Sequence, residues 1–166
     1  MDIKTIKVGY LETNCYILTI KDECIIIDPG DEFSKIKETV GSKKVLGCLV
    51  THFHQDHIEA LEEVTSFYDI EINKESYGPF KYETIETPGH TFDSKTFYFK
   101  EINTMFTGDF IFKSSIGRTD LGGNNKDMIR SLKEFESYSD DIIIYPGHGP
   151  STTLGKEKEF FPLYYK

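Results

Sequence analysis

Three of the five histidines in this chain fall within six consecutive positions. His52, His54 and His57 belong to the segment Thr-His-Phe-His-Gln-Asp-His at residues 51–57, which also contains Asp56. Imidazole nitrogens and carboxylate oxygens are ligands that zinc, iron and manganese accept in proteins. A cluster of this density therefore indicates a metal site.

The spacing within this segment suits two metal ions. His52 and His54 are two positions apart, so in an extended backbone both side chains project to the same side. Asp56 and His57 follow where the chain is predicted to turn into a helix, and their side chains can point toward a second position close by. One strand-to-helix turn can thus supply two ligands to each of two metals.

The other candidate ligands lie in turns farther along the chain. His90 stands in Thr-Pro-Gly-His-Thr, His148 in Pro-Gly-His-Gly, and Asp109 follows an apolar strand in Thr-Gly-Asp. A lone histidine is more often structural, and a lone Asp after Gly is more often a turn former. Because no histidine lies outside these motifs, we interpret all three residues as ligands that complete the metal shells.

The hydrophobic pattern places these motifs at the ends of predicted elements. Strands come first, helices follow some of them, and hairpins are mixed in, which indicates helices layered on packed sheets rather than a doubly wound parallel sheet. Helices are predicted from Phe33 to a stop at Gly41, from Asp56 through Phe67, and over Met128–Tyr138, with a long loop at Phe110–Asn125. Strands are predicted at Ile3–Tyr10, Asn14–Ile20, Cys24–Asp28, Val45–Thr51, Asp69–Asn73, Tyr82–Glu86, Thr96–Lys100, Ile102–Thr107 and Asp141–Tyr145.

The length and net charge of the chain limit the classes of protein to which it can belong. A chain of 166 residues with 38% hydrophobic content can bury a core without disulfides, so residues 1–166 are predicted to form a single domain. The net charge of −9 argues against a nucleic-acid partner, which needs a basic face to neutralise phosphates. We expect a small-molecule substrate.

The cysteines and the N-terminus indicate the compartment. Cys15, Cys24 and Cys48 are odd in number and form no C-x-x-C pair, which is typical of a reducing environment. The N-terminus has no basic-then-apolar signal segment, and the longest apolar runs are too short to span a bilayer. We therefore expect a cytoplasmic protein with no membrane partner.

Taken in order, the histidine and aspartate motifs resemble those of the metallo-β-lactamase superfamily. Asn14-Cys15-Tyr16 and Ile27-Asp28-Pro29-Gly30 match the same family, so the resemblance covers nearly the whole chain. It implies an α+β fold, a four-layer αββα sandwich with the metals at one edge of the sheets. The motifs are His-x-His-x-Asp-His from residue 52, Thr-Pro-Gly-His-Thr from 87, Gly-Asp from 108 and Pro-Gly-His-Gly from 146.

The resemblance also implies a role for each ligand. Asp28 would be a buried residue that supports the ligands from behind, with a simple turn-forming role as the alternative. One divalent metal would be held by His52, His54 and His90, and a second by Asp56, His57 and His148, with Asp109 bridging them.

The loop after Asp109 makes the resemblance specific to one branch of the superfamily. Residues 108–112 and 115–120, which read Gly-Asp-Phe-Ile-Phe and Ser-Ile-Gly-Arg-Thr-Asp, are similar to short single-domain glyoxalase II proteins, the hydroxyacylglutathione hydrolases. This implies thioester hydrolysis by a hydroxide shared between two divalent metals, with zinc expected and iron or manganese as alternatives. Asp56 and Asp109 would be the catalytic carboxylates. Arg118 is a candidate substrate contact, and pairing with Asp120 is its alternative role.

One departure from the family pattern lies beside the ligands. Members often carry Gly-Gly after Asp-His-Ile, whereas Glu59 and Ala60 follow Ile58 here. We expect this difference to affect the first turn of the helix and to leave the ligands in place.

Other activities share these motifs. A mono-iron persulfide dioxygenase would use only His52, His90 and Asp109, so one iron per chain would favour it. A phosphodiesterase or RNA-processing nuclease shares His-x-His-x-Asp-His, but the acidic balance weighs against it. A non-catalytic metal-binding domain is disfavoured by the intact ligand set. True β-lactamases usually place a cysteine where Asp109 stands, and the diiron flavoproteins usually place a Glu where His54 stands, so neither is expected.

Overall fold

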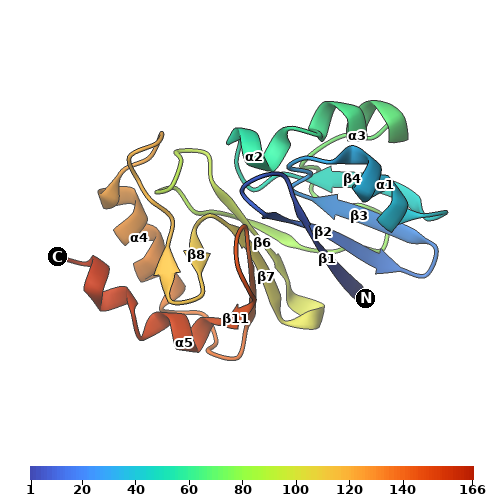
Figure 1. The fold of residues 1–166 in the computed structure, drawn as a ribbon. Coiled ribbons are helices and arrows are strands. Elements are labelled where there is room, and N and C mark those ends of the chain that lie inside the picture. The colour runs from blue at the N-terminus through green and yellow to red at the C-terminus, as the bar shows by residue number, and fades with distance from the viewer. The chain divides into compact units, whose positions relative to one another are not determined.

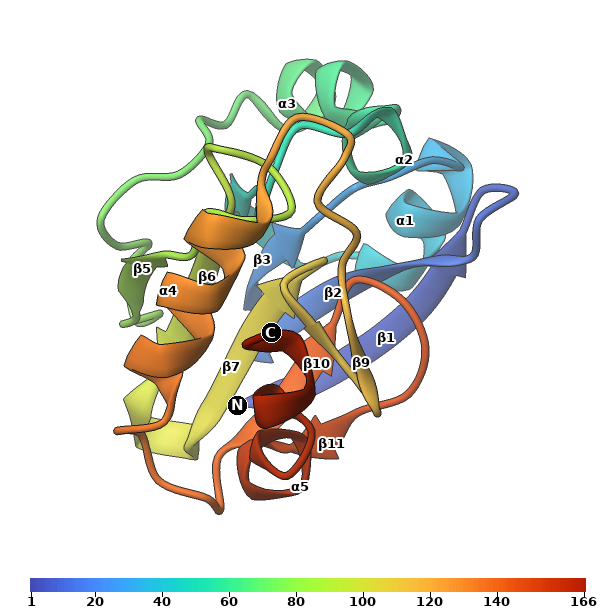
Figure 2. The same ribbon diagram turned by 90° about the vertical axis from the view of Figure 1, so that its left-hand side faces the viewer.

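The computed structural model describes Met1–Lys166 as two compact units, Met1–Tyr82 and Glu83–Lys166 (Figures 1 and 2). Each unit contains one main β-sheet with helices packed on it. Both sheets mix parallel and antiparallel pairs, and together with the helices they confirm the predicted α+β class. The single-domain interpretation of residues 1–166 and the order of the four layers stay predictions.

The first unit is built on a four-stranded sheet in the order β1-β2-β3-β4, drawn in blue to blue-green in Figure 1. The first two pairs are antiparallel, whereas β3 and β4 are parallel and are connected through a helix. The predicted strands and this helix are confirmed, with ends that shift by a few residues. Their bounds are β1 Asp2–Val8, β2 Thr13–Ile20, β3 Glu23–Ile27, α1 Phe33–Val40 and β4 Lys44–Leu49.

Alternate side chains of this sheet form the core of the first unit. Ile17 on β2 and Ile26 on β3 lie on one face, because side chains along a strand alternate between faces. They pack in one cluster with Ile36 and Val40, which are four residues apart on α1 and therefore share one side of that helix. The carboxyl end of β4 then leads directly into the histidine segment.

The single helix predicted after that segment is two short helices, α2 (Gln55–Ile58) and α3 (Leu61–Tyr68). The break falls at Glu59, whose backbone N–H donates to the carbonyl of Gly30 at 3.1 Å. A continuous helix would use this donor within itself. The turn after β3 thus interrupts the helix and holds α2 in place.

The second unit is built on a five-stranded sheet in the order β11-β10-β7-β6-β5. The hairpin predicted between residues 96 and 107 is confirmed as β6 and β7, joined by a 3₁₀ turn at Lys100–Ile102. β7 and β10 are parallel neighbours. The strand bounds are β5 Glu83–Glu86, β6 Lys95–Phe99, β7 Thr104–Gly108, β10 Ile143–Pro146 and β11 Thr152–Thr153.

Helix α4 (Asn125–Phe135) covers the core of the second unit and lies in front of β6 in Figure 2. Leu132 and Phe135 on this helix pack with Met105 of β7. The side chain of Asn124 caps the helix by accepting a hydrogen bond from the third N–H that follows it. A short helix, α5 (Leu154–Lys158), and a 3₁₀ turn at Phe161–Tyr164 complete the unit. No helix in the structure has the length and apolar character needed to cross a bilayer.

Two local predictions need correction. The predicted strand at Asp69–Asn73 makes only one β-bridge, between Cys48 and Ile72, because the side-chain oxygen of Asn73 accepts the N–H of Val50 at 2.8 Å in place of a ladder. The loop predicted to begin at residue 110 contains a small hairpin of β8 (Ile111–Phe112) and β9 (Ser115–Ile116).

Candidate metal centre

The histidine segment of the first unit forms a compact cluster. The rings of His52 and His54 are 4.8 Å apart between centroids, and those of His52 and His57 are 4.2 Å apart. His52 and His57 are buried, whereas His54 and Asp56 are partly exposed. The structure therefore brings the four predicted ligands of this unit together at the end of β4.

Asp28 determines which nitrogen of the His57 ring carries the hydrogen. Its carboxylate accepts the Thr51 N–H at 2.8 Å and the Thr51 hydroxyl at 2.6 Å, and it lies 2.9 Å from Nδ1 of His57. An ionised carboxylate only accepts hydrogen bonds, so Nδ1 of His57 carries the hydrogen. The lone pair of this imidazole is then on Nε2, which is the atom a metal would bind.

The same reasoning extends to His52. The hydroxyl of Thr51 has one hydrogen, which it donates to Asp28, and its oxygen lies 3.1 Å from Nδ1 of His52. Toward His52 the hydroxyl must therefore accept, so Nδ1 of His52 carries the hydrogen and Nε2 carries the lone pair. Thr51 and Asp28 together set both rings in the tautomer that suits a metal ligand.

The turn that carries Asp28 has an unusual backbone. Asp28 has φ +51°, the left-handed region that Asp and Asn tolerate better than most residues. Two residues later, a Cβ added to Gly30 would lie 1.9 Å from the carbonyl oxygen of Asp56, so only glycine fits there. Asp28 thus forms the turn and supports His57 at once, which combines its two predicted roles in one residue.

Asp56 is the carboxylate of the histidine segment, and it is partly accessible. Its Oδ2 accepts the hydroxyl of Thr13 at 2.9 Å and lies 3.5 Å from Nε2 of His57, and a quarter of its side chain (25%) is exposed. Both atoms can therefore meet one cation. Thr13 was not predicted as part of the site, because only the pairing of distant segments brings it to Asp56.

In the second unit, three predicted ligands meet around one carboxylate oxygen. Oδ2 of Asp109 lies 3.5 Å from Nε2 of His90 and 3.6 Å from Nε2 of His148. Asp109 follows β7 and His148 follows β10, and Gly108 lies opposite Pro146 where these parallel strands end. Because parallel strands bring their carboxyl ends to the same sheet edge, both ligands arrive there together.

The loop after β9 orients His90 by its backbone. Nδ1 of His90 lies 2.6 Å from the carbonyl oxygen of Arg118, so this nitrogen donates and the lone pair is again on Nε2. A Cβ added to Gly117 would lie 1.9 Å from the carbonyl oxygen of Asp109 and 3.0 Å from Nδ1 of His90. The glycine before Arg118 thus allows the loop to pass directly beneath both ligands, a role that sequence reasoning missed.

The side chain of Arg118 turns away from this contact and pairs with Asp120. Nε and Nη2 donate to the two carboxylate oxygens at 2.6 Å each, and both side chains are more than half exposed. The guanidinium lowers the pKa of Asp120 to about 2. Of the two roles considered for this side chain, the structure displays the pairing; contact with substrate stays a prediction.

A family model described as the metallo-beta-lactamase superfamily matches residues 8–77 and 78–148. The chain belongs to the metallo-β-lactamase superfamily. Superfamily relatives include a probable metallo-hydrolase, YqgX, from Bacillus subtilis (strain 168), with 31% identity, 98% of this chain and 97% of the relative covered. Hydroxyacylglutathione hydrolase GloC from Haemophilus influenzae is 30% identical, with 98% of each chain covered.

Solved superfamily structures agree with this assignment. BLEG-1, a B3 metallo-beta-lactamase, has a TM-score of 0.92 and 27% identity, with 99% of this chain and 100% of that chain covered. TTHA1623, solved in a di-iron-bound form, has a TM-score of 0.84 and 28% identity, with 93% and 96% covered. This metallo-β-lactamase superfamily member therefore has, in each unit, a histidine and aspartate cluster suited to divalent metals.

Proposed function

We propose that this protein is a two-metal hydrolase that cleaves thioesters of the hydroxyacyl-thiol type. The observation that supports it most strongly is the placement of three histidine rings, His52, His57 and His90, whose Nδ1 atoms lie 3.1, 2.9 and 2.6 Å from oxygen partners that leave them the donor role. This arrangement presents three Nε2 lone pairs as a metal centre requires. The proposed ligands are His52, His54 and His90 for one metal and Asp56, His57 and His148 for the other, with Asp109 shared.

The metals and the carboxylates have separate tasks in this proposal. Two divalent cations would supply hydroxide near neutral pH and polarise the scissile carbonyl. Asp56 has the exposure to accept a proton during turnover while remaining a ligand, and the hydroxyl of Thr13 fixes its Oδ2 by donating to it at 2.9 Å. Asp28 stabilises positive charge that develops on the ring of His57. Since a thiolate is a good leaving group, no strong general acid is needed.

The relatives support the reaction class and leave the metal to be measured. The Haemophilus influenzae relative is named a hydroxyacylglutathione hydrolase, and the Bacillus subtilis relative a probable metallo-hydrolase. We propose zinc, which the histidine and carboxylate ligands suit. Iron is the main alternative, because TTHA1623 is described in a di-iron-bound form.

The proposed setting is the reducing cytoplasm, with a small-molecule substrate and no nucleic-acid or membrane partner. Cys15, Cys24 and Cys48 are all free thiols in the core, which suits a reducing compartment. The net charge of −9 suits a small substrate better than a polyanion.

The decisive experiment measures metal content and thioester turnover on the same samples. We expect about two metal ions per chain and hydrolysis of S-lactoyl thioesters, by analogy with other two-metal hydrolases. His54→Ala should lose metal and activity together, whereas Phe53→Ala, an exposed neighbour in the same segment, should keep its metal count. Full activity and an unchanged metal count in His54→Ala would refute the two-metal assignment.

The same assay separates the alternative activities. One iron per chain with oxygen uptake on glutathione persulfide would identify a persulfide dioxygenase. Cleavage of a bis-aryl phosphate without thioester turnover would identify a phosphodiesterase. Hydrolysis of a chromogenic cephalosporin alone would place the protein with BLEG-1 in activity as well as in fold.

A further inference from the structure

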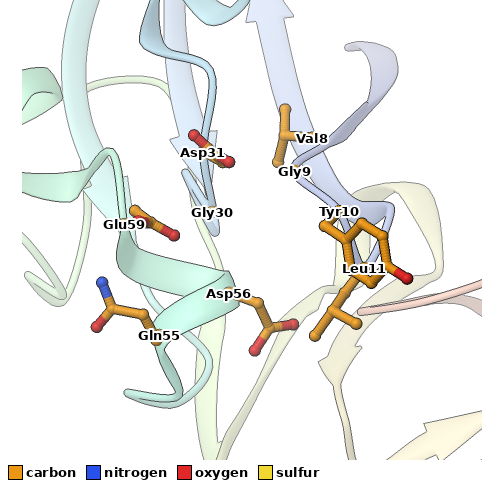
Figure 3. Close-up of a pocket in the computed structure, with 9 residues that line it drawn as sticks. All are labelled: Val8, Gly9, Tyr10, Leu11, Gly30, Asp31, Gln55, Asp56 and Glu59. Carbon is orange, nitrogen blue, oxygen red and sulfur yellow. The ribbon is translucent and has the colours of Figure 1, made fainter.

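A pocket of about 300 Å³ opens beside Asp56 within the first unit (Figure 3). One wall is the turn between β1 and β2, which contributes Gly9, Tyr10 and Leu11. The opposite wall contains Asp31 and Glu59, from the turn after β3 and from the end of α2. Because Asp56 is a proposed metal ligand, a substrate at the metals would extend into this pocket.

The pocket carries an excess of negative charge. No Lys, Arg or His lines it, whereas Asp31 and Glu59 both do. The basic side chains on neighbouring segments are already paired: Lys7 with Glu12 at 3.4 Å, and Lys35 with Glu32, three residues before it, at 3.6 Å. No Lys, Arg or His side chain of this chain pairs with Asp31 or Glu59, so these two carboxylates keep their negative charge at the pocket.

The carboxylate of Asp31 is held in place on this wall. One of its oxygens accepts the backbone N–H of Glu32 at 2.5 Å, and the other would lie 3.0 Å from a Cβ added to Gly9. Glu32 in turn accepts the N–H of Gly9 at 2.9 Å, which ties the two walls together. The negative charge thus occupies a fixed position at the pocket, which a mobile surface carboxylate would not.

The rim of the pocket is apolar and exposed. Tyr10 is 99% exposed and Leu11 is 58% exposed, so both residues offer apolar surface to a molecule that enters the pocket. An aromatic face next to fixed carboxylates is a combination that binds organic cations, through cation–π and Coulomb attraction.

We propose that this pocket selects thioesters that carry a positively charged group, in preference to net-anionic ones such as glutathione conjugates. The proposal rests on the proposed function, because it uses Asp56 as a metal ligand. Asp31 and Glu59 are the residues that determine charge preference, and Tyr10 is the aromatic contact for the cation. An anionic carrier bound at the metals would extend toward the two negative charges of this pocket, of which that of Asp31 is held in place by a hydrogen bond.

The test compares two thioesters of the same shape, cationic acetylthiocholine and neutral 3,3-dimethylbutyl thioacetate. The ratio of their kcat/KM values should favour the cation, and high salt should reduce it. Asp31→Asn and Glu59→Gln should each lower the ratio about threefold, in line with partly exposed charge pairs. In the double variant, S-lactoylglutathione should become a better substrate because the repulsion is removed.

The matched control is the double variant Glu62→Gln/Glu63→Gln. It changes net charge by the same amount on exposed positions of α3, outside the pocket. We expect its ratio to equal that of the unaltered protein. An equal fall in both double variants, or a wild-type ratio of one or below, would overturn the proposal.

A binding measurement separates this proposal from the proposed function. Choline and neutral 3,3-dimethylbutan-1-ol are compared by the NMR shifts of the Gly9 and Gly30 amides, which lie in the pocket walls. Choline should shift them more strongly, and Asp31→Asn with Glu59→Gln should abolish the difference. If no thioester is hydrolysed, the hydrolase assignment fails, while these shifts still decide whether the pocket selects cations.

Discussion

Asp28 links the shape of a turn to the protonation of two histidine rings. A residue at φ +51° with three accepted hydrogen bonds must be small, tolerant of the left-handed region and negatively charged. Asn meets the first two demands and fails the third. The substitution Asp28→Asn therefore isolates the charge from the backbone requirement.

We predict that Asp28→Asn weakens metal binding by about 10- to 100-fold. The amide oxygen must face the Thr51 N–H, so the NH₂ group faces Nδ1 of His57 and moves the ring hydrogen to Nε2. Metal affinity is measured by competition with a chromophoric chelator, and the tautomer by ¹⁵N NMR of the His57 ring. Asp22→Asn, on the exposed turn between β2 and β3, is the control. Unchanged affinity together with an unchanged tautomer would contradict the role assigned to Asp28.

Arg118 orients His90 through its backbone carbonyl, so removal of the Arg118 side chain should leave metal binding unchanged. In Arg118→Ala, the hydrogen bond to Nδ1 of His90 remains, and the pKa of Asp120 should rise from about 2 toward 3.8. Because the folded-state pKa is the lower one, this pair stabilises the fold above the ordinary carboxyl pKa, and the contribution disappears as the pH falls through about 2. A carboxyl NMR titration measures the shift. A large loss of thioester affinity would instead identify Arg118 as a substrate contact.

Among the elements, the parallel pair β7 and β10 determines where the predicted ligands of the second unit meet. These strands place Asp109 and His148 at one edge, and the loop after β9 supports Asp109 and His90 from below through Gly117. The backbone of Asp109 and the ring of His90 lie so close to Gly117 that no space is left for a side chain at that position. The positions of Asp109 and His90 therefore depend on the absence of a side chain at Gly117.

We predict that Gly117→Ala destabilises the protein by about 1–3 kcal/mol, the usual cost of overpacking. A Cβ at 1.9 Å from the Asp109 carbonyl oxygen forces the loop away from the two ligands. Metal affinity should fall at the same time, because the Arg118 carbonyl moves away from Nδ1 of His90. Denaturant unfolding and metal titration measure both effects. Ser115→Ala, an exposed change in the adjoining strand β9, should alter neither.

At the scale of the whole molecule, stability comes from apolar packing, and the cysteines behave as part of the core. Burial raises the pKa of Cys15 and Cys48 well above the usual thiol range and raises the pKa of Cys24 to about 11. All three side chains are buried in the core of the first unit. Thiols that are protonated and buried are poor nucleophiles.

We predict that none of the three thiols reacts with an aromatic disulfide reagent at pH 8 in the folded protein and that all three react after unfolding. Because the folded-state pKa values exceed that of an unfolded thiol, near 9, these groups leave stability independent of pH below 9 and reduce it above 9. Reagent absorbance and a pH series of unfolding curves measure both effects. Rapid modification of the native protein would show that the core opens easily.

The ligand types and their order along the chain were predictable from the sequence, because the histidine motifs are local and interrupt an otherwise apolar pattern. The strands and main helices were also predictable, since the periodicity of buried side chains is a local property. The break between α2 and α3 was not, because it depends on the bond from Glu59 to the distant Gly30.

What only the tertiary structure decided is how the ligands are oriented. The hydrogen bonds from Thr51 and His57 to Asp28 join residues more than twenty positions apart, and the carbonyl that holds His90 belongs to a residue 28 positions away. Residue type alone cannot specify a tautomer, because a ring nitrogen donates or accepts according to the partner that the fold places beside it. The sequence by itself determined which histidines and aspartates are available to bind metal; the folded chain decided which nitrogen His52, His57 and His90 offer.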